Sequence, residues 1–187
     1  MNRVHRWLCR SGWWRRTVEN SLLPWVLKDI ELGQNVLEVG PGPGLTTDVL
    51  RNRVPRLTCV EIDERLADSL SQRMAGSNVT VQRGDATAMS FPDASFDGAV
   101  SFTMLHHVPS AELQDRLLAE VARVLRPNAV FAGSDSRYSR IFGALHLFDT
   151  MVLVDPESLP RRLEAAGFKD VRIDVAKSAF RFRARRA

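Results

Sequence analysis

The chain has 187 residues, of which 44% are hydrophobic and 26% charged, a balance that is ordinary for a single globular domain. No apolar run is long enough to cross a membrane as a helix, and the first residues lack the apolar stretch of a signal peptide. Two cysteines without metal-ligand spacing favour neither a disulfide scaffold nor a zinc site. We therefore expect one cytoplasmic domain, residues 1–187, without a bound metal.

The net charge of +4 is distributed unevenly along the chain. Residues 1–28 carry +5 and residues 178–187 carry +4, so residues 29–177 carry −5. A protein that binds nucleic acid is expected to have basic residues on its folded body. An acidic body with basic ends therefore disfavours a nucleic-acid partner.

The first 30 residues contain all four tryptophans of the chain: Trp7, Trp13, Trp14 and Trp25. Apolar residues recur there at helical spacing with arginines between them, which predicts amphipathic helices. A basic amphipathic segment is also typical of a membrane surface, so peripheral membrane contact stays open as an alternative. We favour helices that pack on a sheet and form a lid over its ligand cleft.

A short apolar run at 36–39, interrupted only by Glu38, predicts a buried strand. Three glycines follow at every second position: Gly40, Gly42 and Gly44. A helix-compatible run at 45–50 comes next. Glycine tolerates positive φ and has no Cβ to keep a ligand away, and a helix N-terminus offers free N–H groups. The stretch therefore predicts a ligand-binding turn between a strand and a helix, although a turn that only connects them is the simpler interpretation.

The spacing of the glycines separates two kinds of cofactor. A dinucleotide site favours the pattern G-x-G-x-x-G, but Leu45 occupies the place of its third glycine. A carboxylate at Glu38 would repel a pyrophosphate and suits a cationic ligand. The turn therefore favours a cationic cofactor, with a nicotinamide-dependent oxidoreductase as the competing interpretation.

The second predicted strand, 57–61, ends in Glu61, which lies 21 residues after Gly40. That spacing is close to the one expected for a carboxylate that binds two ribose hydroxyls. Asp63 precedes a predicted helix at 64–74 and is well placed to cap it. We assign Glu61 to the ribose and Asp63 to the cap, with the reverse assignment as the alternative.

The later elements are a strand at 78–82 followed by Gly84-Asp85-Ala86, a strand at 96–102, a helix at 111–125, a strand at 129–133, a helix at 156–166 and a terminal strand pair at 168–176 and 178–186. Ser101 and Phe102 end the strand 96–102 at the expected opening of the crevice of a doubly wound sheet. The stretch 136–155 is irregular and rich in aromatic residues, which is typical of substrate contacts, with Tyr138 and His146 as candidates.

Five motifs occur in order: E-V-G-P-G-P-G, V-E-I-D, G-D-A, L-H-H-V and R-V-L-R-P-N. Together they resemble a class I S-adenosylmethionine-dependent methyltransferase of the small-molecule, type-11-like group, over roughly residues 34–175. The resemblance implies an α/β fold with a Rossmann-like, doubly wound seven-stranded sheet, order 3-2-1-4-5-7-6, its last strand antiparallel and helices on both faces. It also implies a cofactor-binding core at 34–135 and a substrate-side segment at 136–187. Asn128 departs from the family, which usually has Gly-Gly there.

The resemblance implies S-adenosyl-L-methionine as cofactor, in a site lined by these residues: Glu38, Gly40, Gly42, Gly44, Glu61, Ile62, Asp85, Ala86, Ser101 and Phe102. In the family, the Asp of G-D-A receives the exocyclic amine of adenine. His106 and His107 are the nearest candidates for a general base, because imidazole titrates close to neutral pH. A structural or cofactor-lining role is the equally weighted alternative for both.

The subclass is narrowed by motifs that the sequence lacks. The N/D-P-P-aromatic motif of rRNA adenine dimethylases is replaced by Ser101-Phe102-Thr103-Met104, which disfavours base methylation. Paired acids typical of arginine methylation and a metal-binding acid set are absent as well. The sequence therefore predicts methyl transfer to a small molecule. A cofactor-binding or membrane-associated accessory protein without catalysis is the alternative, and the oligomeric state is not determined.

Overall fold

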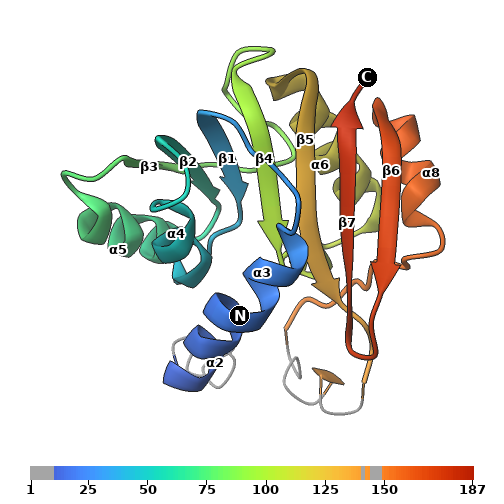
Figure 1. The fold of residues 1–187 in the computed structure, drawn as a ribbon, viewed down its shortest axis with the longest axis horizontal. Helices are drawn as coiled ribbons and strands as arrows, with labels where there is room; N and C mark the ends of the chain where they lie inside the picture. The colour runs from blue at the N-terminus through green and yellow to red at the C-terminus, as the bar shows by residue number, and fades with distance from the viewer. Residues whose placement is uncertain (1–10, 140–141, 144–148) are drawn as a thin grey trace.

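The computed structural model describes residues 11–139, 142–143 and 149–187. Seven strands form one sheet in the order β3-β2-β1-β4-β5-β7-β6 (Figure 1). They are β1 (Asn35–Val39), β2 (Arg56–Glu61), β3 (Val79–Arg83), β4 (Phe96–Phe102), β5 (Leu125–Ser136), β6 (Phe168–Val175) and β7 (Ala179–Arg186). The strands β1 to β5 pair in parallel, whereas β7 is antiparallel to both β5 and β6. The predicted strand order and the antiparallel last strand are confirmed.

Helices cover both faces of the sheet. They are α2 (Gly12–Thr17), a π-helical turn (Val18–Leu22), α3 (Leu23–Val26), α4 (Leu45–Leu50), α5 (Glu64–Met74), a 3₁₀ turn (Leu105–His107), α6 (Ala111–Val124) and α8 (Leu159–Ala165). The helices from α2 to α5 pack in one apolar cluster with Val36, Val100 and Val130 of the sheet. The helices α6 and α8 pack in a second cluster, with Leu37 and Phe131.

The alternation along β1 explains why both clusters form. Val36 and Leu37 are neighbours in the chain, belong to opposite clusters, and are both fully buried. A parallel sheet is covered on both faces, so its strands are almost continuously hydrophobic. The central strands are thereby held firmly, and their carboxyl ends form a fixed edge.

The described part of the N-terminal segment belongs to the core. Val18, Leu23 and Val26 are at most 2% exposed and pack in the cluster on the α4–α5 side of the sheet. The prediction that these helices pack on the sheet is therefore confirmed. The lid role predicted for residues 1–30 remains a prediction, because the residues before Ser11 lie outside the described part of the chain.

The strand predicted at 129–133 is longer in the structure, because β5 begins at Leu125, directly after α6. Asn128 has a φ of 64°, and the pairing of β4 with β5 shifts near this point. Asn is one of the few residues besides glycine that adopts this backbone region readily, so it can stand where the family has glycine. The helix predicted from Pro156 begins later, at Leu159, after a turn.

Replacement of Asn128 tests this interpretation. The substitution Asn128→Ala should lower the free energy of unfolding by about 1 kcal/mol, because a left-handed backbone is costly for residues with an ordinary Cβ. Asn128→Gly should leave it unchanged or raise it. Urea unfolding of both variants measures the difference, and equal stabilities would contradict a conformational role for Asn128.

Candidate active site

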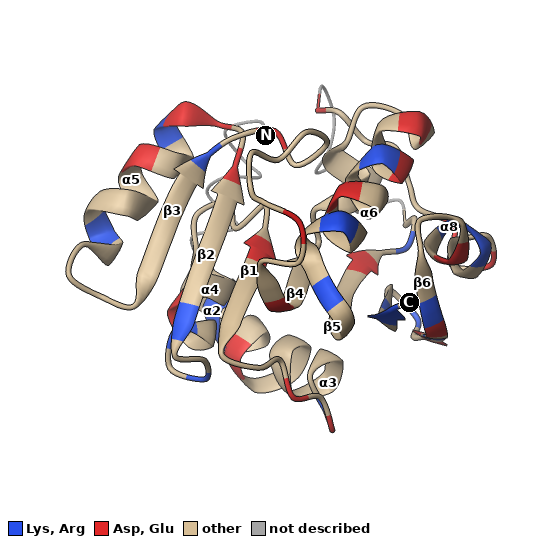
Figure 2. Cartoon of the chain, turned by 90° about the horizontal axis from the view of Figure 1, so that it is seen from above, with Lys and Arg blue, Asp and Glu red and all other residues tan. Residues whose placement is uncertain are grey.

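The carboxyl ends of the parallel strands meet at one edge of the sheet. Three acidic residues lie near the ends of β1, β2 and β5: Glu38, Glu61 and Asp135. Figure 2 shows red, acidic segments at the arrowheads of β1 and β2. Each is at most 6% exposed. A row of buried carboxylates needs hydrogen-bond partners, and these partners define the site.

The glycine turn combines a tightly packed position with an open one. A Cβ added to Gly40 would lie 2.2 Å from the Cγ atom of Met104, so Met104 packs directly on the turn. A Cβ added to Gly42 would meet no atom within 4 Å, and Gly42 has a φ of 55°. Gly40 is therefore required by packing, whereas Gly42 leaves its backbone open to a ligand. Gly44 follows as the N-cap of α4.

Glu38 lies beneath this turn and is 1% exposed. Its carboxylate accepts hydrogen bonds from the hydroxyls of Thr46 and Thr47, the latter at 2.6 Å, at the start of α4. The Sγ atom of Cys59 lies 3.4 Å from the same carboxylate. Burial raises the pKa of Glu38, and the hydroxyl hydrogen bonds partly oppose this rise. Glu38 therefore joins β1 to α4 and holds the turn from below.

Glu61 joins the glycine turn to the end of β2. Its Oε2 atom accepts from the backbone N–H of Gly42 at 2.9 Å, and its Oε1 atom accepts from that of Asp63 at 3.0 Å. Burial raises the pKa of Glu61, and these backbone hydrogen bonds lower it in part. Asp63 accepts from the N–H of Leu66 at 3.1 Å and is the N-cap of α5, as predicted.

Ile62 follows Glu61 at the end of β2, and Asp85 lies just beyond the end of β3, the next strand outward. The Ile62 side chain is 68% exposed although it is large and apolar. Asp85 is exposed, and its Oδ1 atom accepts from the N–H of Thr87 at 2.8 Å. Ala86 is half-buried and packs against the core. The side chains of Ile62 and Asp85 therefore lie at the surface near the ends of β2 and β3.

Ser101 and Phe102 end β4 at the predicted place, but their side chains lie in the sheet's interior, at 0% and 6% exposed. Within the described part of the chain, the buried Ser101 hydroxyl has no hydrogen-bond partner. Thr103 follows with a φ of 48° and donates its N–H to the carbonyl of Ser134 at 2.8 Å. A β-branched residue in this backbone region is strained, and such strain clusters at functional sites. No motif in the sequence indicated it.

His106 is bound by Asp135, which the sequence did not identify as a site residue. The Nδ1 atom of His106 lies 2.5 Å from the Oδ1 atom of Asp135, and the His106 backbone N–H donates to the Oδ2 atom at 3.0 Å. Their side chains are 2% and 0% exposed. An ionised carboxylate only accepts hydrogen bonds, so the ring donates to Asp135 from Nδ1. The ring of His107 lies beside that of His106, with 4.2 Å between the ring centroids.

The candidate substrate residues are less well defined. Tyr138 follows β5 and is 63% exposed. His146 lies outside the described residues. The structure therefore brings together the glycine turn with Glu61 and the histidines with Asp135, and it leaves Tyr138 at the surface.

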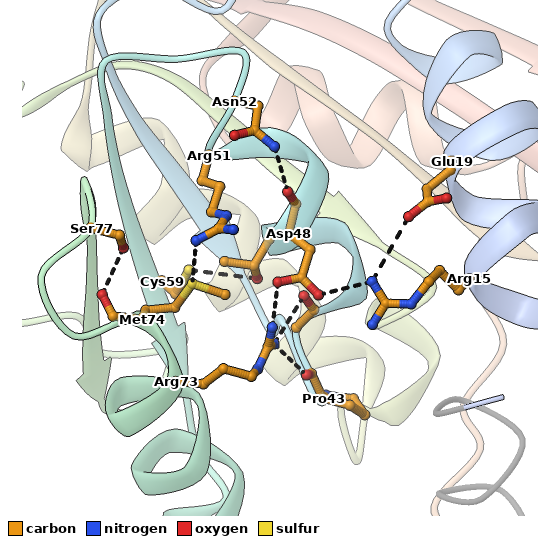
Figure 3. A network of polar contacts seen from close by, with 12 residues as sticks. Arg15, Glu19, Pro43, Asp48, Arg51, Asn52, Cys59, Arg73, Met74 and Ser77 are labelled. Atoms are coloured by element: carbon orange, nitrogen blue, oxygen red, sulfur yellow. Dashed lines mark hydrogen bonds and ion pairs between the residues drawn. The ribbon is translucent and has the colours of Figure 1, made fainter. Parts of the chain in front are cut away.

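Asp48 ties the N-terminal helix to the cofactor turn. It binds Arg15 of α2 at 3.3 Å and also Arg73 of α5 (Figure 3). Arg73 donates in addition to the carbonyl of Pro43, inside the glycine turn, at 2.9 Å. The helices α2 and α5 are thus joined to the turn through one carboxylate on α4.

Among the described residues, no group of three or more His, Cys, Asp or Glu side chains could hold a metal ion. No helix in the same ranges is long and apolar enough to span a membrane.

The fold and the glycine turn define a nucleoside-cofactor protein of the doubly wound class, and comparisons with known proteins specify the family. The family described as "Methyltransferase domain" matches residues 37–133. The chain therefore belongs to the methyltransferase-domain family, and its cofactor is S-adenosylmethionine. This result confirms the resemblance found in the sequence.

Curated relatives match the sequence of this chain over parts of their own length. A probable S-adenosylmethionine-dependent methyltransferase of Mycolicibacterium smegmatis is 31% identical over 141 residues, which is 73% of this chain and 52% of that protein. The ribosomal RNA small subunit methyltransferase A of Deinococcus radiodurans is 48% identical over 54 residues, 29% of this chain and 18% of that protein. The chain thus spans about half the length of the first relative and less than a fifth of the second.

Solved structures agree over nearly the whole fold. A methyltransferase from Aquifex aeolicus, described as dependent on S-adenosylmethionine, superposes with a TM-score of 0.78 at 21% identity, covering 100% of both chains. The PH0226 protein of Pyrococcus horikoshii superposes with a TM-score of 0.82 at 17% identity, covering 96% of this chain and 94% of that chain.

The residues present fit the cofactor. Gly42 leaves an open backbone, Glu61 places a buried carboxylate beside it, and Ile62 exposes an apolar surface next to both. A nucleoside needs these three features: close approach, an acceptor for its hydroxyls and an apolar contact for its base.

The raised pKa of Glu38 gives a prediction for stability. An acid whose pKa is higher in the folded than in the unfolded protein contributes stability below its unfolded pKa, and this is lost as pH rises. The difference in free energy of unfolding, Glu38→Gln minus wild type, should therefore increase as pH rises above about 4.5. Urea unfolding of both proteins between acidic and neutral pH measures it. Parallel curves would show that the burial of Glu38 does not govern its charge.

Proposed function

We propose that this protein transfers the methyl group of S-adenosylmethionine to a small-molecule acceptor. The observation that supports this most directly is the hydrogen bond between Glu61 and the Gly42 N–H, at 2.9 Å. It fixes a buried carboxylate at the glycine turn, where a ribose would meet it. The family membership gives the cofactor, and the lack of an N/D-P-P-aromatic motif after β4 favours a small acceptor over a base in RNA.

The cofactor would be held by residues at the ends of four strands, β1 to β4. Glu61 would accept hydrogen bonds from the ribose hydroxyls, and Ile62 would pack against the adenine ring. Asp85 would accept a hydrogen bond from the exocyclic amine of adenine. The other residues of the proposed site act mainly through the backbone or through packing: Gly40, Gly42, Gly44, Ala86, Ser101 and Phe102. Glu38 would act on the cofactor through the turn that it supports, because hydroxyls of α4 already bind its carboxylate.

The bound cofactor supplies a methyl group that is already electrophilic. The chain then has to position the acceptor, exclude water and, for a hydroxyl acceptor, remove a proton. We assign proton removal to the Nε2 atom of His106, because Asp135 holds the other ring nitrogen. The proposed contacts to the acceptor are His107, Tyr138 and His146.

Two alternatives remain distinguishable. An accessory protein that binds the cofactor without catalysis, at a membrane or elsewhere, would show cofactor binding without methyl transfer to any acceptor. Methyl transfer to RNA is suggested by relatives that are named as ribosomal RNA methyltransferases, but the matched segments are short, 54 residues in one case.

Binding of S-adenosylhomocysteine to two carboxylate variants tests the cofactor site. Glu61→Ala should weaken binding strongly, because each charge-assisted hydrogen bond to a hydroxyl contributes about 1.5–3 kcal/mol. Asp63→Ala should instead lower the free energy of unfolding by about 1 kcal/mol and leave the affinity close to that of the wild type. Calorimetric titration measures both affinities.

Glu61→Gln is the control that preserves the shape of the side chain near Gly42.

The melting temperature of the wild type should rise with S-adenosylhomocysteine and should not rise with NAD, since only a ligand that binds the folded state stabilises it. A gain with NAD alone, or a larger loss of affinity in Asp63→Ala, would refute the proposed site.

The role of Asp135 is tested by the tautomer of His106. In the wild type, a proton NMR resonance of Nδ1–H should be shifted far downfield by the buried carboxylate, and Asp135→Asn should remove that shift. With pooled phenols as acceptors, His106→Gln should lower the rate of methyl transfer by about 10²-fold or more, as expected for loss of a general base.

Asp135→Asn should lower the turnover number and change the Michaelis constant little, because Asp135 positions the base and does not contact the acceptor. Pooled tertiary amines, which have no proton to lose, serve as the matched acceptors. Equal losses with amines and phenols would show that His106 has a structural role only.

A further inference from the structure

The strands β6 and β7 expose a strongly basic face. Phe180, Phe182 and Ala184 of β7 are at most 2% exposed, so the residues between them point to the opposite side of the sheet. The register places Lys169 opposite Arg185, Arg172 opposite Arg183, and Asp174 opposite Arg181. Paired residues share a face, and we call this set the arginine face: Lys169, Arg172, Asp174, Arg181, Arg183 and Arg185.

The arginine face adjoins α3 and is not covered by any described helix. Arg183 pairs with Ala132 of β5, whose side chain belongs to the cluster under α3. In Figure 1, α3 lies in front of the central strands, and the described residues place no helix in front of β6 and β7. The guanidinium of Arg181 lies 5.5 Å from the ring centroid of Trp25, which marks the border between α3 and the face.

The charges of this face are poorly neutralised within the protein. Asp174 binds Arg181 at 2.8 Å. The other four bases form no ion pair with any described residue: Lys169, Arg172, Arg183 and Arg185. Like charges directly opposite on neighbouring strands destabilise a sheet. The pairs Lys169–Arg185 and Arg172–Arg183 therefore oppose folding, and a bound anion would relieve this repulsion.

The sequence alone suggests that the basic residues 178–187 are an end separate from the acidic body, and the structure does not support that separation at this face. In the structure, Ala179–Arg186 form β7, which lies between β5 and β6 inside the sheet (Figure 1). Lys169 and Arg172 of the formally acidic stretch join them. The folded body consequently carries a basic surface.

We propose that the arginine face binds single-stranded RNA. Alternate residues along a strand lie about 6.6 Å apart, so Arg181, Arg183 and Arg185 present a row of cations that can follow successive phosphates. Arginine binds phosphate with two parallel hydrogen bonds. Arg181, which lies over the Trp25 ring at the edge of the row, presents a guanidinium plane, and unstacked RNA bases stack on such planes.

Asp174 selects RNA over DNA in this arrangement. It is the single acid on the face, and its side chain is 60% exposed. A carboxylate would repel a phosphate, but it can accept a hydrogen bond from a ribose 2′-hydroxyl, a group that DNA lacks. The binding surface is independent of the methyl acceptor, which enters at the strand ends.

A membrane is the less suitable occupant of this face. Surface binding to a bilayer combines basic residues with apolar side chains that insert. The large apolar side chains that are exposed in the described residues lie elsewhere: Trp13, Ile62, Tyr138, Leu153 and Val175. Val175 pairs with Phe180 and therefore belongs to the other face of the sheet.

Fluorescence anisotropy with a labelled 12-nucleotide uridine RNA tests the proposal. The variant Arg172→Gln/Arg183→Gln/Arg185→Gln should bind at least tenfold more weakly than the wild type. The logarithm of the wild-type binding constant should fall with the logarithm of salt concentration by about 0.7 per neutralised phosphate, and this slope should decrease in the variant.

A matched control removes the same charge from other surfaces. Arg53, Arg116 and Arg161 are exposed and lie outside the arginine face, so Arg53→Gln/Arg116→Gln/Arg161→Gln should change the affinity less than twofold. The single variant Arg172→Gln, at an exposed position, gives an intermediate loss if the triple variant does not fold. The wild type should bind the uridine RNA more tightly than a labelled 12-nucleotide thymidine DNA, and Asp174→Ala should bring these two affinities together.

Three results would overturn the proposal. These are equal losses in the face variant and the control, no RNA binding at low salt, or stronger binding to phosphatidylserine vesicles or polyglutamate than to the RNA. Calorimetric binding of S-adenosylhomocysteine should be unchanged in the face variant. A failure at the arginine face therefore leaves the proposed methyl transfer intact, and a failure of the cofactor site leaves RNA binding intact.

Discussion

The buried carboxylate of Glu38 is the interaction on which the cofactor edge depends. An isolated carboxylate in a protein interior is costly, and hydrogen bonds offset that cost. Thr46 and Thr47 provide them from the first turn of α4, so strand, glycine turn and helix form one unit. Glu61 then binds Gly42 from β2 and fixes the same turn from its other side. Two carboxylates thus preform the turn, and a ligand does not have to order it.

The sequence predicted the elements best where local chemistry decides their ends. The bounds of α5 agree with the prediction because Asp63 caps its start. Near Pro127, the residues Arg126 to Asn128 have the composition of a turn, yet β5 begins before them. Leu125 pairs with Phe96 and Val130 with Gly98, so pairing with β4 resumes after these residues, and they form an irregularity inside β5 in which Asn128 takes a left-handed backbone. Local patterns do not contain this tertiary contribution.

The site was predictable in its motifs and not in its contacts. The sequence placed Glu38 and Glu61 at strand ends and His106 after the strand 96–102, but it did not predict the hydroxyls of α4 that bind Glu38. The partner of His106 is 29 residues away, at Asp135, and is reached only because β4 and β5 are neighbours with a particular register. The spacing of residues along the chain does not show which side chains meet once the chain has left the strands at the edge of the sheet.

The arginine face shows why charge should be counted on surfaces and not along the chain. Residues 178–187 are a terminus in the sequence, but β7 is inserted between β5 and β6, so its arginines border the core. The alternation that buries Phe180 and Phe182 necessarily places Arg181 and Arg183 together on the other side. Because Lys169 and Arg172 of β6 lie opposite them, residues from the stretch 29–177, whose net charge is negative, add to a positively charged surface. An apolar pattern of period two in a basic segment therefore predicts a charged sheet face, and the position of the strand within the sheet decides whether a helix covers it.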